Sequence, residues 1–364
     1  MTSPSIPAMQ APPKKSRWMR FVKRVLIGAF LLLVCAALAG AAYQTIANWR
    51  DARRFPQEGR SIALGAEFRG VSLNLNCLGQ GSPTVILDSG LGVPAAGWDL
   101  VMPDVAKFAR VCSYDRAGYG WSSAGPMPRT SAEIVRELHA LLAASGEKGP
   151  YVLVAHSFGG YNVRVYADKY PADVAGLVLV DASHEDQEQL MPPSLRKLTQ
   201  DQVRQLDSQK HLMPILILFG IARLTAGDEG DSKLSKDFRD KMKYLQLQTK
   251  FIDAAFSEIK SFAESAEEVR RTGNLGERPL VVLTAGKDLK AKELPKGVSV
   301  EDMREFGKTW VNDLQVRQAR LSTRGQQVVV PDSTHMIPME RPDAVVNAIR
   351  EVCDAVQAGP GPKS

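Results

Sequence analysis

One segment of the chain sets its architecture: YVLVAHSFGG, residues 151–160. Its first half has the composition of a buried strand, and a helix can begin directly after it with no intervening loop. A serine on such a sharp turn presents its hydroxyl above the sheet, and small residues are needed two positions before and after it because the backbone passes itself closely there. Ala155 and Gly159 hold those two positions. The segment therefore predicts that Ser157 is a nucleophile.

Strands and helices alternate on both sides of this segment. Short apolar runs predict the strands, and amphipathic runs between them predict the helices. Since the strands are almost entirely Val, Leu and Ile, we predict an α/β fold with a mostly parallel sheet covered by helices on both faces. The predicted strands are 60–68, 71–77, 84–88, 110–114, 151–155, 176–180, 279–284 and 326–330, and the predicted helices are 94–108, 131–145, 158–169, 302–322 and 342–357.

Residues 182–275 interrupt this alternation. They are charged and mostly helical in composition, so we predict a helical insertion between two strands of the sheet. The insertion contains an apolar stretch, LMPILILFGIA at 212–222, which is too short to cross a bilayer. We interpret this stretch as the core of the insertion. The alternatives are that it lines an entrance to the site or touches lipid.

The chain has five histidines, and one of them is placed to act as a base. His335 follows the predicted strand 326–330, and groups that face a ligand gather in loops at the carboxyl ends of strands in open α/β sheets. We therefore predict that His335 accepts the proton of Ser157. The other four are expected on a helix surface, beside the serine and in the insertion: His139, His156, and both His184 and His211.

Two aspartates could orient this histidine and stabilise its charged form. Asp288 follows the strand 279–284, and Asp181 directly ends the strand 176–180. Both lie between the serine and the histidine in the chain, and either loop could bring a carboxylate to the imidazole. The sequence leaves the choice between them open.

A glycine-containing loop, DSGLG at 88–92, follows another predicted strand. We predict that the N–H groups of Leu91 and Phe158 form an oxyanion hole. The same loop loosely fits a dinucleotide-binding fingerprint, but Pro94 is awkward for that motif and the serine and histidine would be left without a role. The chain has no metal-type spacing of Cys and His. We therefore expect neither a cofactor nor a metal.

The net charge of +6 is unevenly distributed along the chain. The first 54 residues carry nine basic and one acidic side chain, which gives +8, and the remaining 310 residues carry −2. A basic face that could bind duplex nucleic acid is therefore not expected in the bulk of the protein. We predict no nucleic-acid partner, and the oligomeric state is left open.

The N-terminal charge surrounds a run of 19 uncharged residues, VLIGAFLLLVCAALAGAAY at 25–43. Roughly 17–25 apolar residues span a bilayer, whereas the apolar region of a cleaved signal peptide usually has about 7–15. We predict an uncleaved transmembrane signal-anchor. The alternative is cleavage at the A-x-A pattern of 37–41, which would release a secreted or periplasmic protein. Val34 before Cys35 does not suit lipoprotein processing.

The flanking charges predict the orientation of this anchor. Six Lys or Arg residues precede the run closely and three follow it, so the positive-inside rule places the N-terminus in the cytoplasm and residues 50–364 outside. Outside the cytoplasm a disulfide between Cys77 and Cys112 is permitted. Two buried free thiols are the alternative.

Four motifs in this order resemble the α/β-hydrolase superfamily of serine hydrolases over nearly all of residues 60–357. The motifs are DSGLG at 88–92, SYDRAGYGWSS at 113–123, VLVAHSFGG at 152–160 and STHMIPMERPDAV at 333–345. The resemblance implies an eight-stranded sheet with a cap inserted after the sixth strand, which matches residues 182–275. It also implies that Asp115 helps to shape the site without doing chemistry.

The resemblance also bears on the choice of acid, on the nucleophile and on the two cysteines. In most of the superfamily the acid follows the seventh strand, which narrowly favours Asp288, although Asp181 after the sixth strand stays open. Related dehalogenases and epoxide hydrolases use an aspartate nucleophile where this chain has Ser157, which argues against both activities. The sheet order of the superfamily makes Cys77 and Cys112 neighbours.

We thus predict a serine hydrolase that cleaves a small carboxylic ester with an apolar part. Other chemistry of the same fold is the alternative: hydrolysis of amides, thioesters or carbon–carbon bonds, perhydrolysis, or a binding module without catalysis. The predicted segments are a cytoplasmic basic tail at 1–24, a transmembrane helix at 25–43, a linker at 44–59, the catalytic core at 60–181 and 276–358, the cap at 182–275 and a disordered tail at 359–364.

Overall fold

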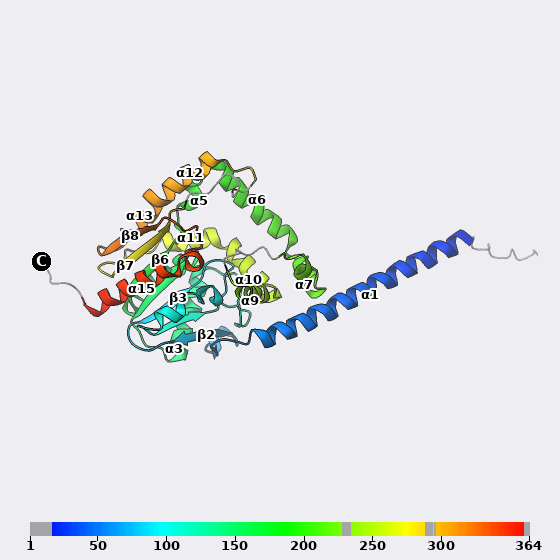
Figure 1. Ribbon diagram of the computed structural model, residues 1–364, viewed down its shortest axis with the longest axis horizontal. Coiled ribbons are helices and arrows are strands. Elements are labelled where there is room, and N and C mark those ends of the chain that lie inside the picture. The colour runs from blue at the N-terminus through cyan, green and yellow to red at the C-terminus, as the bar shows by residue number, and fades with distance from the viewer. Residues whose placement is uncertain (1–16, 228–233, 288–293, 295, 360–364) are drawn as a thin grey trace, which may run out of the picture.

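The sheet of the computed structural model, which describes residues 17–227, 234–287, 294 and 296–359, contains eight strands in the order β1-β2-β4-β3-β5-β6-β7-β8 (Figure 1). β2 runs antiparallel to both of its neighbours, and the strands from β4 to β8 are parallel. This confirms the predicted α/β fold with an eight-stranded, mostly parallel sheet. The strands are β1 Arg60–Ala63, β2 Ser72–Leu78, β3 Thr84–Asp88, β4 Val111–Tyr114, β5 Tyr151–His156, β6 Val174–Val180, β7 Leu280–Ala285 and β8 Gly325–Val330.

Both faces of the sheet are covered, as the composition of β5 requires. Leu153 and Ala155 face a core cluster that includes residues of α3, α4 and α11, whereas Val152 and Val154 face a second cluster built with α2 and α15. Successive strand side chains point to opposite faces, so a strand that is apolar at every position is stable only between two layers of helices. The covering helices are α2 Met102–Val105, α3 Ser131–Ser145, α4 Gly159–Lys169, α11 Phe262–Arg270 and α15 Pro342–Gln357.

Two predicted helices are divided in the structure. The segment predicted as a helix at 94–108 forms a short 3₁₀ turn, η2 Ala95–Trp98, and then α2, where Pro103 stands in the first turn. Proline has no N–H for a helix interior, so it favours a new start over continuation. The segment 302–322 forms α12 Val300–Thr309, a π-helical turn η5 Trp310–Leu314 and α13 Gln315–Ala319.

Between β6 and β7, the described residues form helices and no strand. They are α5 Gln187–Leu190, α6 Pro193–Gln209, α7 Met213–Leu218, α8 Ile221–Thr225, α9 Lys236–Gln246, α10 Thr249–Lys260 and α11. This agrees in composition with a helical insertion, while its extent of 182–275 as a separate cap stays a prediction. α6, α7 and α8 form an arm that reaches from the top of the domain toward α1 (Figure 1).

The interpretation of residues 212–222 as insertion core holds only in part, because four of the eleven residues are exposed. Ile217 and Ala222 are buried, but Leu212, Ile215 and Leu218 are exposed. The stretch forms two short helices separated by Gly220, and α7 packs against α10 and α1. Among the described residues, one side of the pair is therefore covered and the other side is exposed.

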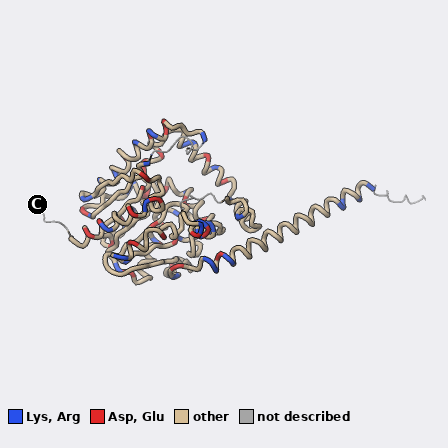
Figure 2. Tube along the Cα trace, viewed as in Figure 1, with Lys and Arg blue, Asp and Glu red and all other residues tan. Residues whose placement is uncertain are grey.

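The N-terminal helix α1, Arg17–Arg54, extends away from the domain (Figure 1). It contains the predicted apolar run 25–43, and Figure 2 shows charged residues only toward its two ends. Its side chains along the run are almost all exposed, and by length and composition it can cross a membrane. The predicted tail residues 1–16 and 360–364 lie outside the described part of the chain.

Cys77 on β2 and Cys112 on β4 are directly opposite each other and form a disulfide. The sequence left open whether these cysteines form a disulfide or remain free thiols, and in the structure they form the disulfide. Cys353 is a buried free thiol in α15, and Cys35 is exposed on α1.

Candidate active site

Ser157 occupies the turn between β5 and α4 in a strained backbone conformation. Its φ is +53°, in the left-handed region that costs most residues of order 1–3 kcal/mol. The turn is possible because its neighbours are small. A Cβ on Gly159 would lie 2.7 Å from the carbonyl oxygen of Asp88, and one on Gly160 would lie 2.5 Å from the Cβ of Ala182. The start of α4 is thus pressed against the ends of β3 and β6, which fixes the serine above the sheet.

His335 lies between this serine and an aspartate. Its Nε2 is 2.9 Å from the Oγ of Ser157, and its Nδ1 is 2.6 Å from the Oδ2 of Asp181. Because an ionised carboxylate only accepts hydrogen bonds, we assign the ring proton to Nδ1, which leaves Nε2 free to accept the serine hydroxyl. The aspartate is buried, whereas the imidazole is half exposed. The arrangement suits proton transfer from the serine.

Asp181 is held by two further donors. Its Oδ1 accepts the N–H of Ala285 at 2.9 Å and the indole N–H of Trp310 at 2.8 Å. Its own backbone has a φ of +42°, directly after β6. The carboxylate is therefore fixed with Oδ2 toward the imidazole. Asp288, the acid that the resemblance narrowly favours, lies outside the described residues and stays a prediction.

His156 precedes the serine and supports the histidine loop. Its Nε2 lies 2.8 Å from the carbonyl oxygen of His335, so this nitrogen carries the proton and donates it. The ring is buried. Burial, with a smaller contribution from the nearby His335, lowers the pKa of His156 to about 3. It is therefore neutral at physiological pH and acts as a fixed donor.

The loop 88–92 lies against the serine. A Cβ on Gly90 would be 3.1 Å from the Cβ of Ser157 and 2.9 Å from the Nδ1 of His156, so only glycine fits there. Neither the N–H of Leu91 nor that of Phe158 has an acceptor among the hydrogen bonds of the described residues. Both groups are free to donate to a substrate, as an oxyanion hole requires.

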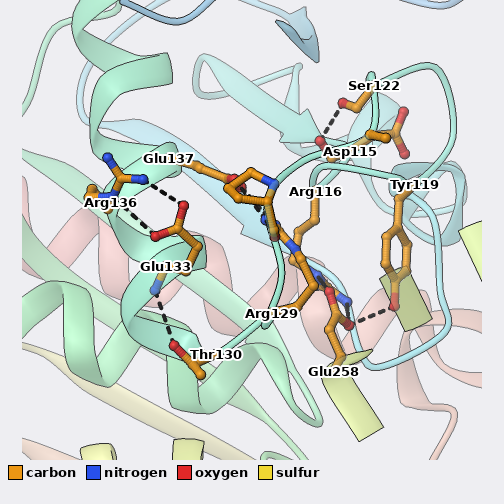
Figure 3. Close-up of polar contacts among 12 residues, drawn as sticks. Asp115, Arg116, Tyr119, Ser122, Arg129, Thr130, Glu133, Arg136, Glu137 and Glu258 are labelled. Carbon is orange, nitrogen blue, oxygen red and sulfur yellow. Dashed lines mark hydrogen bonds and ion pairs between the residues drawn. The ribbon is translucent and has the colours of Figure 1, made fainter. Parts of the chain in front are cut away.

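Arg116 ties this loop to the insertion through a buried ionic cluster (Figure 3). Its guanidinium donates to the carbonyl oxygens of Ser89 at 2.6 Å and Gly90 at 2.9 Å. It also forms ion pairs with Asp88 at 2.9 Å and with Glu258 of α10 at 2.8 Å. All three charged side chains are buried, and the pairing of both carboxylates with the one guanidinium offsets the cost of removing them from water.

Tyr119 and Asp115 also hold the loop 88–92 and the residues after it in place. Tyr119 donates to Glu258 at 2.6 Å, and its hydroxyl accepts the N–H of Gly92 at 3.1 Å. Asp115 accepts the N–H groups of Ala95 and Trp121. These bonds tie Asp115 to the segment after the loop 88–92, and the site-shaping role that the resemblance implies for it stays a prediction.

Ser157, Asp181 and His335 line one end of a cleft of about 730 Å³. Its lining also includes Met303 and Phe306 of α12 and Trp310 of η5. A second cavity of about 740 Å³ lies on the other side of the histidine loop and is lined by Met336, Met339, Phe238 and Met242, among others. Both cavities are of the size that takes a small organic ligand.

Two residues of this site carry no local sequence signal. Trp310 and Glu258 reach their partners only through folding, and Glu258 is 142 positions from Arg116. Arg116 stands in the motif SYDRAGYGWSS at 113–123, but the motif alone does not indicate its partners. A π-helical turn, a feature frequent at functional sites, brings Trp310 toward Asp181. That turn replaces the regular helix that periodicity predicts.

The remaining histidines lie elsewhere in the described structure. His139 stacks on Tyr170 with ring centres 3.7 Å apart, and the Nδ1 of His184 accepts the N–H of Asp186. His211 is exposed next to α7.

One group of side chains among the described residues has the spacing of a metal site: Cys77, Cys112 and Glu147. The two cysteines are joined in a disulfide, and Glu147 is paired with Arg110 at 2.6 Å. Disulfide sulfurs are not thiolates, so this group does not fit a metal.

Comparison with known proteins places the chain in a family. A thermophilic esterase from Thermogutta terrifontis superimposes with a TM-score of 0.52 and 22% identity, covering 82% of this chain and 98% of its own. The uncharacterized protein YqjL of Bacillus subtilis is 34% identical over 30% of this chain and 43% of its own length. The 2-hydroxy-6-oxo-2,4-heptadienoate hydrolase of Pseudomonas putida is 35% identical over 34% of this chain and 44% of its own. The matched parts span less than half of these two curated relatives.

The sequence model of one family matches most of the chain. It is described as the alpha/beta hydrolase family and aligns with residues 85–348, which contain β3 to β8 and all three side chains at the end of the cleft. The chain therefore belongs to the alpha/beta hydrolase family.

Proposed function

We propose that this protein is a membrane-anchored serine hydrolase that cleaves carboxylic esters through an acyl-enzyme on Ser157. One observation carries the proposal: the hydrogen-bonded series from Ser157 through His335 to Asp181, with separations of 2.9 and 2.6 Å. This is the arrangement of nucleophile, base and orienting acid that activates an otherwise weak hydroxyl nucleophile.

In the first half of the reaction, the Oγ of Ser157 attacks the ester carbonyl carbon as its proton passes to the Nε2 of His335. Asp181 stabilises the imidazolium that forms and keeps its orientation. The negative carbonyl oxygen is held by the N–H groups of Leu91 and Phe158. The bond to the alcohol then breaks, and the alcohol leaves with the proton from His335.

In the second half, water replaces the alcohol. His335 takes a proton from the water as the water oxygen attacks the acyl carbon. The bond between the acyl carbon and the Oγ of Ser157 then breaks, His335 returns the proton to that oxygen, and the acid is released. No step requires a cofactor. Met303 and Phe306 in the cleft favour an ester with an apolar acyl or alcohol part.

Carbon–carbon bond hydrolysis is a second candidate. It is favoured by the local identity to the protein named 2-hydroxy-6-oxo-2,4-heptadienoate hydrolase. The two candidates differ in which bond to the carbonyl carbon is broken. It is a carbon–oxygen bond in an ester and a carbon–carbon bond in the second candidate. Turnover of that dienoate at a higher kcat/KM than a short-chain nitrophenyl ester would favour the second one.

The anchoring part of the proposal is supported by α1. Its length and composition suit a membrane, and the basic residues that precede its apolar run favour a cytoplasmic N-terminus. The disulfide between Cys77 and Cys112 is of a kind that persists outside the cytoplasm. We propose that the catalytic domain lies on that side.

Labelling by a fluorophosphonate probe tests the nucleophile. The full-length protein in detergent should become covalently labelled, because the probe reacts with activated serines. Ser157→Ala should abolish both labelling and hydrolysis of a short-chain nitrophenyl ester. Ser208→Ala, at an exposed serine of α6, should retain both. Absence of labelling in the unmodified protein would refute the proposal.

A further inference from the structure

The two short helices of the insertion carry an outward row of large apolar side chains. The row is spaced by three residues along the chain and consists of Leu212, Ile215, Leu218, Ile221 and Leu224, each between 43% and 69% exposed. Single exposed apolar residues are ordinary, but a contiguous group marks a surface that contacts something other than water. We refer to these five residues as the apolar row.

The turn between these helices is seated directly on α1. A Cβ on Gly40 would lie 2.4 Å from the carbonyl oxygen of Phe219, and a Cβ on Gly220 would lie 2.8 Å from the ring of Tyr43. Small residues let two helices approach this closely, as they do between helices within membranes. The insertion thus touches α1 at the last residues of the apolar run 25–43.

The position of this contact along α1 gives its depth. At about 1.5 Å per residue, Gly40 lies roughly 22 Å and Tyr43 roughly 27 Å from Val25, compared with about 30 Å for the hydrocarbon core of a bilayer. The contact therefore falls just inside the outer boundary of that core. Tyr43 and Trp49 are of the residue types that gather at this boundary.

A polar clasp lies immediately beyond it. Arg223 of α8 forms an ion pair with Asp51 and donates to Asn48 at 2.8 Å and to Gln44 at 3.2 Å. Gln44 lies at the boundary, whereas Asn48 and Asp51 lie roughly 35 and 39 Å from Val25, where headgroups and water can solvate them. The insertion thus contacts α1 in two places. The ion pair between Arg223 and Asp51 lies beyond the hydrocarbon core, and the close contact at Gly40 and Tyr43 lies near the outer boundary of that core.

We propose that α7 and α8 insert the apolar row into the outer leaflet as a second, non-spanning membrane contact. The proposal rests on α1 being retained as the anchor. We expect lipid to cover the apolar row, because the row lies beside the apolar run of α1, which faces lipid if α1 is the anchor. Amphipathic helices lying in the interface bury their apolar face by about 5–10 Å in this way.

A cavity lies beside this proposed membrane contact. The second cavity is lined by Ala226 and Gly227, directly after α8, and by Met336, the residue next to His335. Its lining combines apolar residues such as Leu234 and Phe238 with charged side chains such as Lys243. The insertion therefore places a ligand-sized recess next to both the proposed lipid contact and the histidine loop.

Fluorescence quenching in proteoliposomes tests the docking. The full-length protein carries Cys35→Ala to remove its exposed thiol, and Leu218→Cys is labelled with an environment-sensitive nitrobenzoxadiazole probe. The matched control is Val328→Cys on β8, which is 41% exposed at the opposite edge of the sheet. The vesicles contain phosphatidylcholine with a nitroxide near the headgroup end of one acyl chain.

Emission at position 218 should be blue-shifted and quenched several-fold more than at position 328. Equal quenching at the two positions, or none at 218, overturns the proposal. A blue shift that grows with protein-to-lipid ratio without nitroxide quenching assigns the row to a second copy of the chain and also overturns it. Intact mass establishes that α1 is retained. Hydrolysis of a short-chain nitrophenyl ester is measured in parallel, so failure of the esterase activity is distinguished from failure of docking.

Discussion

At the residue scale, the imidazole of His335 is positioned by groups on three separate segments. Asp181 accepts from its Nδ1, and His156 donates to its backbone carbonyl oxygen. Trp310 holds the other oxygen of Asp181. The serine hydroxyl therefore meets a ring whose orientation and tautomer are already set, which lowers the reorganisation required during proton transfer.

Replacing Trp310 tests this support. Trp310→Phe keeps an aromatic ring in the cleft but removes the N–H donated to Asp181, and a hydrogen bond to a charged group contributes about 1.5–3 kcal/mol. We expect kcat on a short-chain ester to fall about tenfold or more, with KM little changed. Trp49→Phe on α1 is the control. A rise in KM with kcat unchanged would contradict a positioning role.

The depressed pKa of His156 predicts a pH dependence of stability. The folded protein keeps this ring neutral down to about pH 3, whereas the unfolded chain protonates it near the ordinary value of 6.5. The free energy of unfolding should therefore fall as the pH drops through this window, by up to about 1.4 kcal/mol per pH unit. Urea unfolding in detergent at pH 7.5 and 5 measures it. His156→Gln, which retains a donor and cannot titrate, should show a smaller difference between the two pH values.

At the scale of elements, the loop 88–92 depends on a charge cluster that joins β3 to α10. Arg116 makes two hydrogen bonds to the loop backbone and pairs with two buried carboxylates. The glycines of the loop contribute no side-chain packing, whereas Leu91 packs against the core of the sheet. Arg116 therefore helps to hold the Leu91 N–H in place from the preceding backbone carbonyl groups, and Tyr119 binds the following N–H of Gly92.

Removal of the arginine should be costly. Arg116→Met leaves Asp88 and Glu258 buried without their partner, and breaking a buried ion pair in this way costs about 3–5 kcal/mol. We expect a loss of that size in chemical unfolding of the full-length protein. Arg317→Met, at an exposed pair with Asp313, should cost less than about 1 kcal/mol. Equal losses would contradict the role given to burial.

At the scale of the whole molecule, the antiparallel edge of the sheet is fastened by the bridge between Cys77 and Cys112. It closes a segment of 35 residues, and the loop-entropy relation gives about 4 kcal/mol for a loop of that size. The bridge connects the first strands after α1 to the parallel part of the sheet. The N-terminal helix α1 and the parallel part of the sheet are thereby joined through a cross-linked edge.

The double substitution Cys77→Ala and Cys112→Ala should lower the free energy of unfolding by about 2–4 kcal/mol. Cys353→Ala, at an unpaired buried thiol, is the matched control for loss of side-chain volume. Alkylation followed by intact-mass measurement should show two more reactive thiols after reduction than before. An unchanged mass would contradict the bridge and remove one support for the extracytoplasmic location.

The sequence predicts those parts of the molecule that are encoded locally. Ser157 and His335 stand in short motifs at the ends of apolar strands, and the structure brings them together. The acid could not be chosen because Asp181 and Asp288 both follow strands, and only folding determines which loop approaches the imidazole. The exposure of Leu218 was missed because an apolar run has the same composition whether protein or lipid covers it.

One short connection has a consequence for how substrate is found. α1 ends at Arg54 and β1 begins at Arg60, so the five residues between them reach at most about 18 Å. Arg54 is itself paired with Asp237 and Asp240 of α9. If α1 is retained, the catalytic serine cannot sweep through the surrounding volume on a tether. An ester dissolved in the bilayer would then meet it by lateral diffusion, and the encounter rate would follow the surface density of the substrate rather than its concentration in water.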